Sequence, residues 1–258
     1  MKKFMAFLFA LTMLLTLTAC GGSGDSAADD TFVLSIGTSP DFPPFENLDG
    51  SGAVTGIEID ILEKVCEEYG WTLEINQMDF DSVLPGVQAG KFVLGVSGIT
   101  VTEKRKENAL FTQPYCMAAQ AIVVTADSAI TCKADLDGKK VSVQTGTTAE
   151  SYCMESGYEV SAYQANSDAQ AAVLSGKVDA WVIDDLTAKD MVDTYNASNP
   201  GALVVLSEAM TSEPYAFAAS KDNQEVIDQI DAALDEMLAD GTIKAIFEAN
   251  NAPYTSPK

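Results

Sequence analysis

Short strand-like runs alternate with longer helix-like segments from Phe32 almost to the end of the chain. FVLSI, residues 32–36, is an apolar strand candidate, and GIEIDILEKVCEEYG, residues 56–70, has the apolar spacing of a helix that ends at Gly70. Two further helical segments, 223–241 and 242–250, complete the chain. This alternation predicts an α/β fold with mostly parallel sheets.

The alternation falls into two series of the same rhythm, with joins near residues 114–120 and 212–217. We interpret the joins as two crossings between two lobes. Lobe 1 is then predicted to contain residues 32–117 and 217–258, and lobe 2 residues 118–216. Two lobes joined by two strands leave a cleft, and the carboxyl ends of parallel strands open into such a cleft.

The first twenty residues have the pattern of a secretory signal, with Lys2 and Lys3 before an apolar run. Residues 17–20, LTAC, resemble the bacterial lipobox, which implies removal of residues 1–19 and attachment of diacylglycerol to Cys20. An ordinary secretory signal with an incidental cysteine is the alternative. Residues 20–31 are rich in Gly, Ser and Asp and are expected to form a flexible tether. We therefore expect a protein outside the cytoplasm that is lipid-anchored to the cell membrane.

Charge and residue types exclude several function classes. The chain has 38 acidic and 15 basic residues and a net charge of −23, so nucleic acid is not an expected partner. We expect the protein to be a soluble monomer. There is no histidine, which excludes a Ser-His-Asp triad and mixed Cys/His zinc sites. No metal and no cofactor are expected. The four cysteines after Cys20 allow three disulfide pairings, between which the sequence does not choose: Cys66, Cys116, Cys132 and Cys153.

Arg105 is the only arginine of the chain and follows a predicted buried strand. Residues 100–103 fit a helix capping box, or Thr102 is the cap. Either way the cations at 104–106 fall in the first helical turn, where the helix dipole disfavours positive charge. A bound carboxylate would relieve this conflict.

Arg105 can bind such a carboxylate with two parallel hydrogen bonds, and the hydroxyls of Ser97 and Thr100 can add to them. The alternative is a surface ion pair between Arg105 and an acid such as Glu103. The position of Arg105 after a buried strand favours the role in binding a carboxylate.

The predicted second lobe has a similar helix start, in which Thr147 and Glu150 fit a capping box. The free N–H groups of such a start bind anions, although a plain helix cap is the alternative. Asp184 and Asp185 end another strand. Asp185 is placed to cap the next helix, so Asp184 remains available to hold an ammonium group.

Aromatic residues on loops supply candidate walls. Phe42 and Phe45 lie in a proline-rich loop after the first strand, and Phe80 follows the third strand-like segment. We expect Phe45 and Trp181 in the core, and Phe42 and Phe80 on either side of an apolar ligand stem.

Together these segments resemble the extracellular solute-binding proteins of family 3, the polar amino-acid receptors of ATP-binding-cassette importers. The resemblance runs from about Phe32 to about Asn250 and rests on GTSPDFPPFE, GIEIDILEKV, FDSVLPGVQAGK, ITVTEKR, VQTGTTAE, VDAWVID and EPYAFA. It implies a two-lobed periplasmic-binding-protein type II fold with a hinge.

The resemblance also implies roles for single residues. The α-carboxylate of the ligand would bind Arg105, and Asp184 would accept from the α-ammonium. The other implied contacts are a hydroxyl from Thr100, the backbone of Gly98, the second-lobe carboxylate contacts Thr147 and Thr148, and the aromatic pair Phe42 and Phe80.

The implied function is capture of a free amino acid and its delivery to a membrane permease, without turnover. Receptors for lysine or arginine often carry an acid a few residues before the first loop aromatic, where this chain has Ser39 and Pro40, so a neutral or polar amino acid is favoured. The alternatives are a sensor that signals through a partner chain and a dehydratase-like enzyme that uses Asp184 or Glu46 as acid or base.

Overall fold

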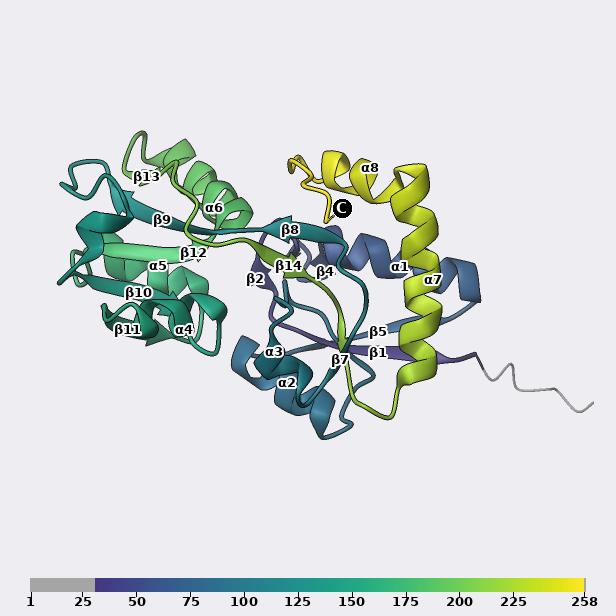
Figure 1. Ribbon diagram of the computed structural model, residues 1–258. Coiled ribbons are helices and arrows are strands. Elements are labelled where there is room, and N and C mark those ends of the chain that lie inside the picture. Colours follow the sequence, from purple (N-terminus) through teal and green to yellow (C-terminus); the bar gives the residue numbers. More distant parts are fainter. Residues whose placement is uncertain (1–30, 258) are drawn as a thin grey trace, which may run out of the picture. The chain divides into compact units, whose positions relative to one another are not determined.

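The structure, a computed structural model, describes residues 31–257. The predicted signal peptide, residues 1–19, the predicted lipidation site Cys20 and residues 21–30 of the predicted tether lie outside the described residues. Within the described part, two five-stranded sheets form the centres of two lobes, which are linked by a pair of extended segments (Figure 1).

The sheet of lobe 1 has the order β5-β1-β6-β15-β7. Its first three strands are parallel, and its last two run antiparallel to their neighbours. The strands are β1 (Val33–Thr38), β5 (Thr72–Gln77), β6 (Leu94–Gly95), β7 (Leu110–Phe111) and β15 (Ala218–Ala219).

Five helices and a small three-stranded sheet accompany the sheet of lobe 1. The apolar face of α1 is fully buried through Ile57, Ile61 and Leu62, as the sequence spacing predicted. The helices are α1 (Ile57–Tyr69), α2 (Phe80–Gln88), α3 (Glu103–Lys106), α7 (Gln224–Asp240) and α8 (Thr242–Ala249). The small sheet contains β2 (Asp41–Phe42), β3 (Glu46–Leu48) and β4 (Val54–Thr55).

The sheet of lobe 2 has the order β11-β10-β12-β9-β13 and repeats the plan of three parallel and two antiparallel strands. The strands are β9 (Gln120–Thr125), β10 (Lys140–Gln144), β11 (Glu159–Tyr163), β12 (Ala180–Asp184) and β13 (Leu203–Val205). The helices are η1 (Lys133–Leu136), α4 (Thr148–Glu155), α5 (Asn166–Leu174) and α6 (Asp185–Ser198).

The chain crosses between the lobes twice, through β8 (Cys116–Ala118) and β14 (Glu213–Tyr215). These two strands lie side by side and pair antiparallel, with Glu213 opposite Ala118 (Figure 1). The first crossing continues into β9 of lobe 2, and the second returns to β15 of lobe 1.

The predicted two-lobed α/β fold is confirmed, whereas the expectation of mostly parallel sheets is only half correct. Each sheet has two parallel and two antiparallel pairings. The antiparallel strands β9 and β15 are those that enter a sheet directly from a crossing. They need no βα crossover on the way, so nothing requires them to run parallel to their neighbours.

The interior is apolar and contains the residues that the sequence pattern assigned to the core. Trp181 and Phe45 are both 0 % exposed. The four described cysteines are unpaired. Cys66, Cys116 and Cys153 are buried, and burial raises the pKa of the Cys153 thiol to about 12.

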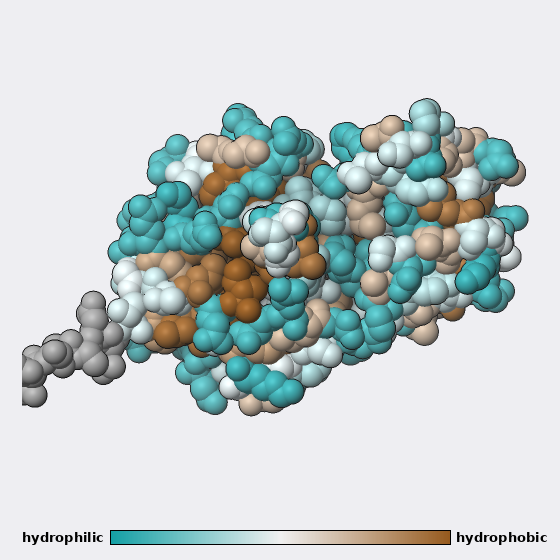
Figure 2. Space-filling view, turned by 180° about the vertical axis from the view of Figure 1, so that it is seen from behind, coloured by the Kyte–Doolittle hydropathy of each residue, from teal (hydrophilic) through white to brown (hydrophobic). Residues whose placement is uncertain are grey.

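The surface is mostly hydrophilic, with a hydrophobic area on lobe 1 (Figure 2). This fits a chain in which acidic residues outnumber basic ones 38 to 15. No helix within residues 31–257 is both long enough and apolar enough to cross a membrane.

Gly56 precedes α1 with a φ of 136°, and a Cβ atom there would lie 2.3 Å from the carbonyl oxygen of Phe45. Because the neighbour is backbone, the clash cannot be relieved by a rotamer change. We expect Gly56→Ala to lower the free energy of unfolding by about 1–3 kcal/mol or more, as measured by urea denaturation. Gly50→Ala is the control, since no atom lies within 4 Å of its added Cβ. Equal midpoints for the two variants would contradict this account.

Candidate ligand-binding site

One cavity brings together all nine residues that sequence reasoning proposed as ligand contacts. It has one further lining residue, Gln144 at the end of β10. The nine predicted residues that line it are Phe42, Phe80, Ser97, Gly98, Thr100, Arg105, Thr147, Thr148 and Asp184.

The cavity lies where the carboxyl ends of strands from both lobes meet. Residues 97–100 follow β6 of lobe 1, and Asp184 ends β12 of lobe 2. Thr147 and Thr148 form the start of α4, directly after β10. This is the position that the strand order of parallel α/β sheets favours for ligands.

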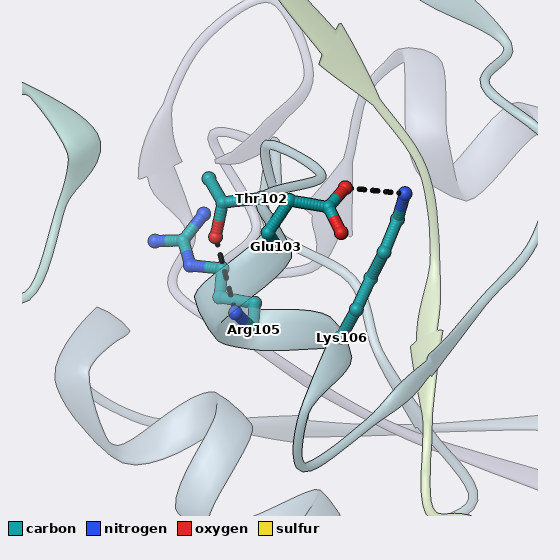
Figure 3. A network of polar contacts seen from close by, with 4 residues as sticks. All are labelled: Thr102, Glu103, Arg105 and Lys106. Atoms are coloured by element: carbon teal, nitrogen blue, oxygen red, sulfur yellow. Dashed lines mark hydrogen bonds and ion pairs between the residues drawn. The ribbon is translucent and has the colours of Figure 1, made fainter.

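The segment that carries Arg105 is a four-residue helix capped by Thr102, whose side chain accepts from the Arg105 N–H at 3.1 Å (Figure 3). Glu103 pairs with Lys106 at 2.9 Å instead of with Arg105. The predicted conflict with a helix dipole is wrong. In a helix of one turn, the first turn is also the last, so its cations lie equally near both ends.

The Arg105 guanidinium is held by two backbone carbonyls, one from each lobe. It donates from Nη1 to the Thr100 oxygen at 2.8 Å and from Nη2 to the Gly146 oxygen at 3.2 Å. A guanidinium has five N–H groups, so three remain for other partners. No carboxylate of the described residues lies within ion-pair distance of it, and burial lowers its pKa. The site therefore contains a cation that no carboxylate within residues 31–257 contacts directly, while Glu213 and Asp184 act on it from a longer distance.

The start of α4 adds further donors beside Arg105. The Thr147 hydroxyl accepts from the Glu150 N–H at 3.1 Å, and the Glu150 carboxylate accepts from the Gly146 N–H at 2.7 Å. The N–H groups of Thr148 and Ala149 belong to the first helical turn and have no intrahelical acceptor. Arg105 and this turn together form the donor side of the cavity, which suits an anion.

Asp184 is a buried carboxylate on the opposite lobe and does not cap the helix that follows it. Asp184 occupies the N-cap position of α6 without a capping bond from its side chain, whereas Asp185 is the first helical residue and accepts from the N–H of its neighbour Leu186 at 2.9 Å, so the predicted capping role of Asp185 is wrong. Asp184 accepts from Gln120 Nε2 at 3.0 Å. Burial, and then the charge of Glu213, raise the pKa of Asp184 to about 8. A bound cation would favour its ionised form.

The hydroxyl and amide protons on the lobe 1 side of the cavity are already used inside the protein. Ser97 donates to Glu46 at 2.8 Å and accepts from the Ser39 N–H at 3.1 Å. The Gly98 N–H donates to Glu58 at 2.9 Å. Ser97 therefore has no proton for a ligand carboxylate, contrary to the sequence-based expectation. Gly98 can offer only its carbonyl oxygen, which is an acceptor.

Glu46 and Glu58 form a fully buried pair of acids behind this loop. Sequence reasoning named Glu46 only as a candidate acid or base and did not identify Glu58 or the pair. Tyr115 donates its hydroxyl to Glu58 at 2.6 Å. Burial, followed by the charge of Glu58, holds the pKa of Glu46 well above its usual range. The pair fixes both Ser97 and Gly98.

The two predicted aromatic walls have different environments. Phe42 is 7 % exposed and leaves no room beside it at Gly98, where a Cβ atom would lie 2.5 Å from the Phe42 ring. Gly98 also has a φ of +52°, so glycine is favoured there twice over. Phe80 is only partly buried, and its ring centre lies 5.8 Å from the Arg105 guanidinium carbon. Phe80 thus makes a cation–π contact with Arg105 and also forms part of the cavity wall.

The lobes touch directly beside the cavity. The Asp41 carboxylate of lobe 1 accepts from the Asn166 N–H at 2.7 Å and from Gln144 Nε2 at 3.3 Å, both of lobe 2. Sequence reasoning did not select Asp41 or Gln144 as site residues, since their partners come from distant parts of the chain. These bonds show that the two half-sites are brought together.

A larger, more open cavity adjoins the site and shares Arg105, Thr147 and Thr148 with it. No cluster of three or more His, Cys, Asp or Glu side chains in the described part of the chain is arranged to hold a metal ion.

Comparisons with known proteins agree with this geometry. The family model for bacterial extracellular solute-binding proteins, family 3, matches residues 34–251. A probable histidine-binding protein of Campylobacter jejuni is 31 % identical over 252 residues, which cover 93 % of this chain and 95 % of that protein.

Two solved structures are similar over most of both chains. An ancestral arginine-binding protein bound to glutamine has a TM-score of 0.77 and 37 % identity, over 84 % of this chain and 96 % of that one. The ancestral amino acid-binding protein AncCDT-1, a precursor of cyclohexadienyl dehydratase, has a TM-score of 0.76 and 34 % identity, over 84 % and 94 %.

Proposed function

Because the chain belongs to the bacterial extracellular solute-binding proteins, family 3, we propose that it captures a free amino acid between its two lobes. It then delivers this amino acid to the permease of an ATP-binding-cassette importer. A ligand that contacts both lobes favours the closed form, and the closed form is the shape that a permease can recognise.

One observation supports the proposal: a cation without a direct ion-pair partner among the described residues and a buried carboxylate line the same cavity from different lobes. Arg105 and the first turn of α4 are the donors for an α-carboxylate. Asp184, Thr100 and the carbonyl of Gly98 are the acceptors for an α-ammonium. A zwitterion neutralises both charges at once, and a free amino acid is the common metabolite of that form.

We further propose a neutral or polar side chain for the ligand. Among the lining residues of the cavity, Arg105 and Asp184 are the two that carry charge. Both are used by the α-groups, so no third charge among the residues that line this cavity remains for an ionised ligand side chain. The other lining groups are hydroxyls, an amide and two phenyl rings, which suit an amide or a hydroxyl.

The place of action that we propose is outside the cytoplasm, at the cell membrane. This part of the proposal rests on the lipobox-like residues before Cys20 and on the family. The lipid would keep the binding protein beside its permease. We propose that it acts as a monomer.

An enzyme on the same fold is the second candidate. A carboxyl with a pKa of about 8, such as that of Asp184, can move protons near neutral pH. The similar ancestral protein AncCDT-1 is described as the precursor of a dehydratase. Incubating the protein with a bound amino acid and following it by NMR separates the two functions, because a receptor leaves the amino acid unchanged.

A thermal-shift screen with the common amino acids tests the proposal. An amino acid present at about 100 times its dissociation constant should stabilise the protein by roughly 2.7 kcal/mol. We expect a neutral or polar amino acid such as L-glutamine to give the largest shift, compared with arginine, histidine and cystine. A larger shift with arginine would contradict the side-chain preference alone. No shift with any amino acid would contradict the function.

A further inference from the structure

Glu213 is a buried carboxylate on the crossing strand β14, and it meets both lobes at the ligand site. It is 5 % exposed. Its Oε2 atom accepts from the Thr100 hydroxyl at 2.6 Å and from the Thr148 hydroxyl at 2.7 Å. Its Oε1 atom accepts from the Thr211 hydroxyl at 2.8 Å. Among residues 31–257 it belongs to no ion pair, so three hydroxyls hold it.

These bonds decide what the two cavity hydroxyls can do. A hydroxyl has one proton and two lone pairs, and a carboxylate can only accept. Thr100 and Thr148 therefore give their protons to Glu213 and turn their lone pairs elsewhere. Thr148 also accepts from Gln120 Nε2 at 3.4 Å, which leaves Thr100 as the freer acceptor. Neither hydroxyl can then donate to a ligand carboxylate.

The same bonds connect the lobes. Thr100 follows β6 of lobe 1, Thr148 begins α4 of lobe 2, and both meet one oxygen atom of Glu213. The two hydroxyl oxygens lie 3.5 Å apart. Separation of the lobes would break at least one of the two bonds, so the full set of oriented hydroxyls exists only when the half-sites are together.

We propose that Glu213 is a positioning residue that orients the Thr100 and Thr148 hydroxyls as acceptors and so fixes the end of the site at which the ligand ammonium binds. This inference rests on the proposed amino-acid binding. Glu213 acts through the hydroxyls, and its reach to both of them matters more than its charge.

Two conservative variants separate the effect of the length of the Glu213 side chain from the effect of its negative charge. Glu213→Gln loses the charge but keeps the length and one carbonyl oxygen, which can accept from both threonines while the amide nitrogen faces Thr211. Glu213→Asp keeps the charge but is one methylene shorter and cannot reach both hydroxyls. Glu208→Gln is the control, because Glu208 is exposed and accepts from the Lys133 N–H outside the cavity.

The experiment is calorimetric titration of the parent and the three variants with L-glutamine, its analogue without the α-amine, 5-amino-5-oxopentanoate, and L-glutamine α-amide. The affinity ratio of L-glutamine to the analogue without the amine reports the ammonium end. We expect Glu213→Asp to lower this ratio about tenfold or more, and Glu213→Gln to keep most of it. The ratio of L-glutamine to its α-amide, which reports the carboxylate end, should be unchanged in both variants.

A larger loss in Glu213→Gln than in Glu213→Asp would overturn the inference, since charge and not reach would then matter. Unchanged ratios in both variants would also overturn it and leave Glu213 a structural residue. If the parent protein does not bind L-glutamine but binds L-arginine, the two affinity ratios are measured with L-arginine, its analogue without the α-amine and its α-amide. If the parent binds neither, the proposed function fails, independently of any variant.

Discussion

Arg105→Ala is expected to abolish amino-acid binding while the protein still folds. Truncating one partner of a buried, hydrogen-bonded charge pair typically costs about 2–5 kcal/mol, which is roughly a 30- to 5,000-fold weaker dissociation constant. The loss should be near the upper end, because three guanidinium N–H groups remain for the ligand beyond the two that bind carbonyl oxygens. Calorimetric titration with the amino acid that gives the largest thermal shift measures it.

The stability of the ligand-free protein should change little in Arg105→Ala. The guanidinium is partly buried and has no carboxylate partner within 4 Å in the described part of the chain, so its removal also removes a desolvation cost. Lys104→Ala is the matched control: it is the neighbouring cation, it is exposed, and it should bind like the parent. A variant Arg105→Ala that binds as tightly as the parent would show that the site is assigned wrongly.

Amino-acid affinity is expected to fall as the pH is lowered below about 8. The free protein holds Asp184 with a pKa of about 8, and an ammonium ligand favours its ionised form. Below pH 8, binding must therefore release a proton, and affinity should drop by up to about tenfold per pH unit, or roughly 50-fold between pH 8 and pH 6. Titrations in buffers of different ionisation enthalpy count the released proton directly.

Asp184→Asn should remove this dependence together with most of the binding, because an amide neither titrates nor balances an ammonium. Affinity at pH 8 should fall by roughly 100-fold, and what remains should be nearly independent of pH. Asp193→Asn, on the exposed face of α6, is the control and should keep the full slope. A slope that persists in Asp184→Asn would assign the proton to another group, of which the nearby Glu213 and Asp185 are the first to examine.

The order of elements and the chemistry-bearing residues could be read from the sequence. Helix and strand periods differ, so the segment 56–70 and the strand 180–184 were recognisable from their spacing. The lone guanidinium and the first of two adjacent acids stood out by residue type and position. Asp184 stood apart because Asp185 was expected to cap the next helix, but the structure places Asp184 itself at the N-cap position, without a capping bond from its side chain.

One of the arguments that selected Arg105 was wrong, although Arg105 does line the cavity. Arg105 was selected partly because cations seemed to oppose a helix dipole, yet α3 has only four residues and no such opposition exists. The length of a helix depends on packing against its surroundings, and the local sequence does not state it.

By itself the sequence determined the α/β plan and the two charges of the site, because periodicity and residue type are local properties. Only the tertiary structure decided where the hydroxyl protons go. Glu46, Glu58 and Glu213 are buried beside the site, and each binds groups 40 or more residues away along the chain. Such partners meet only when the sheets and crossing strands are assembled, and burial then sets which groups donate, which accept and which keep a proton.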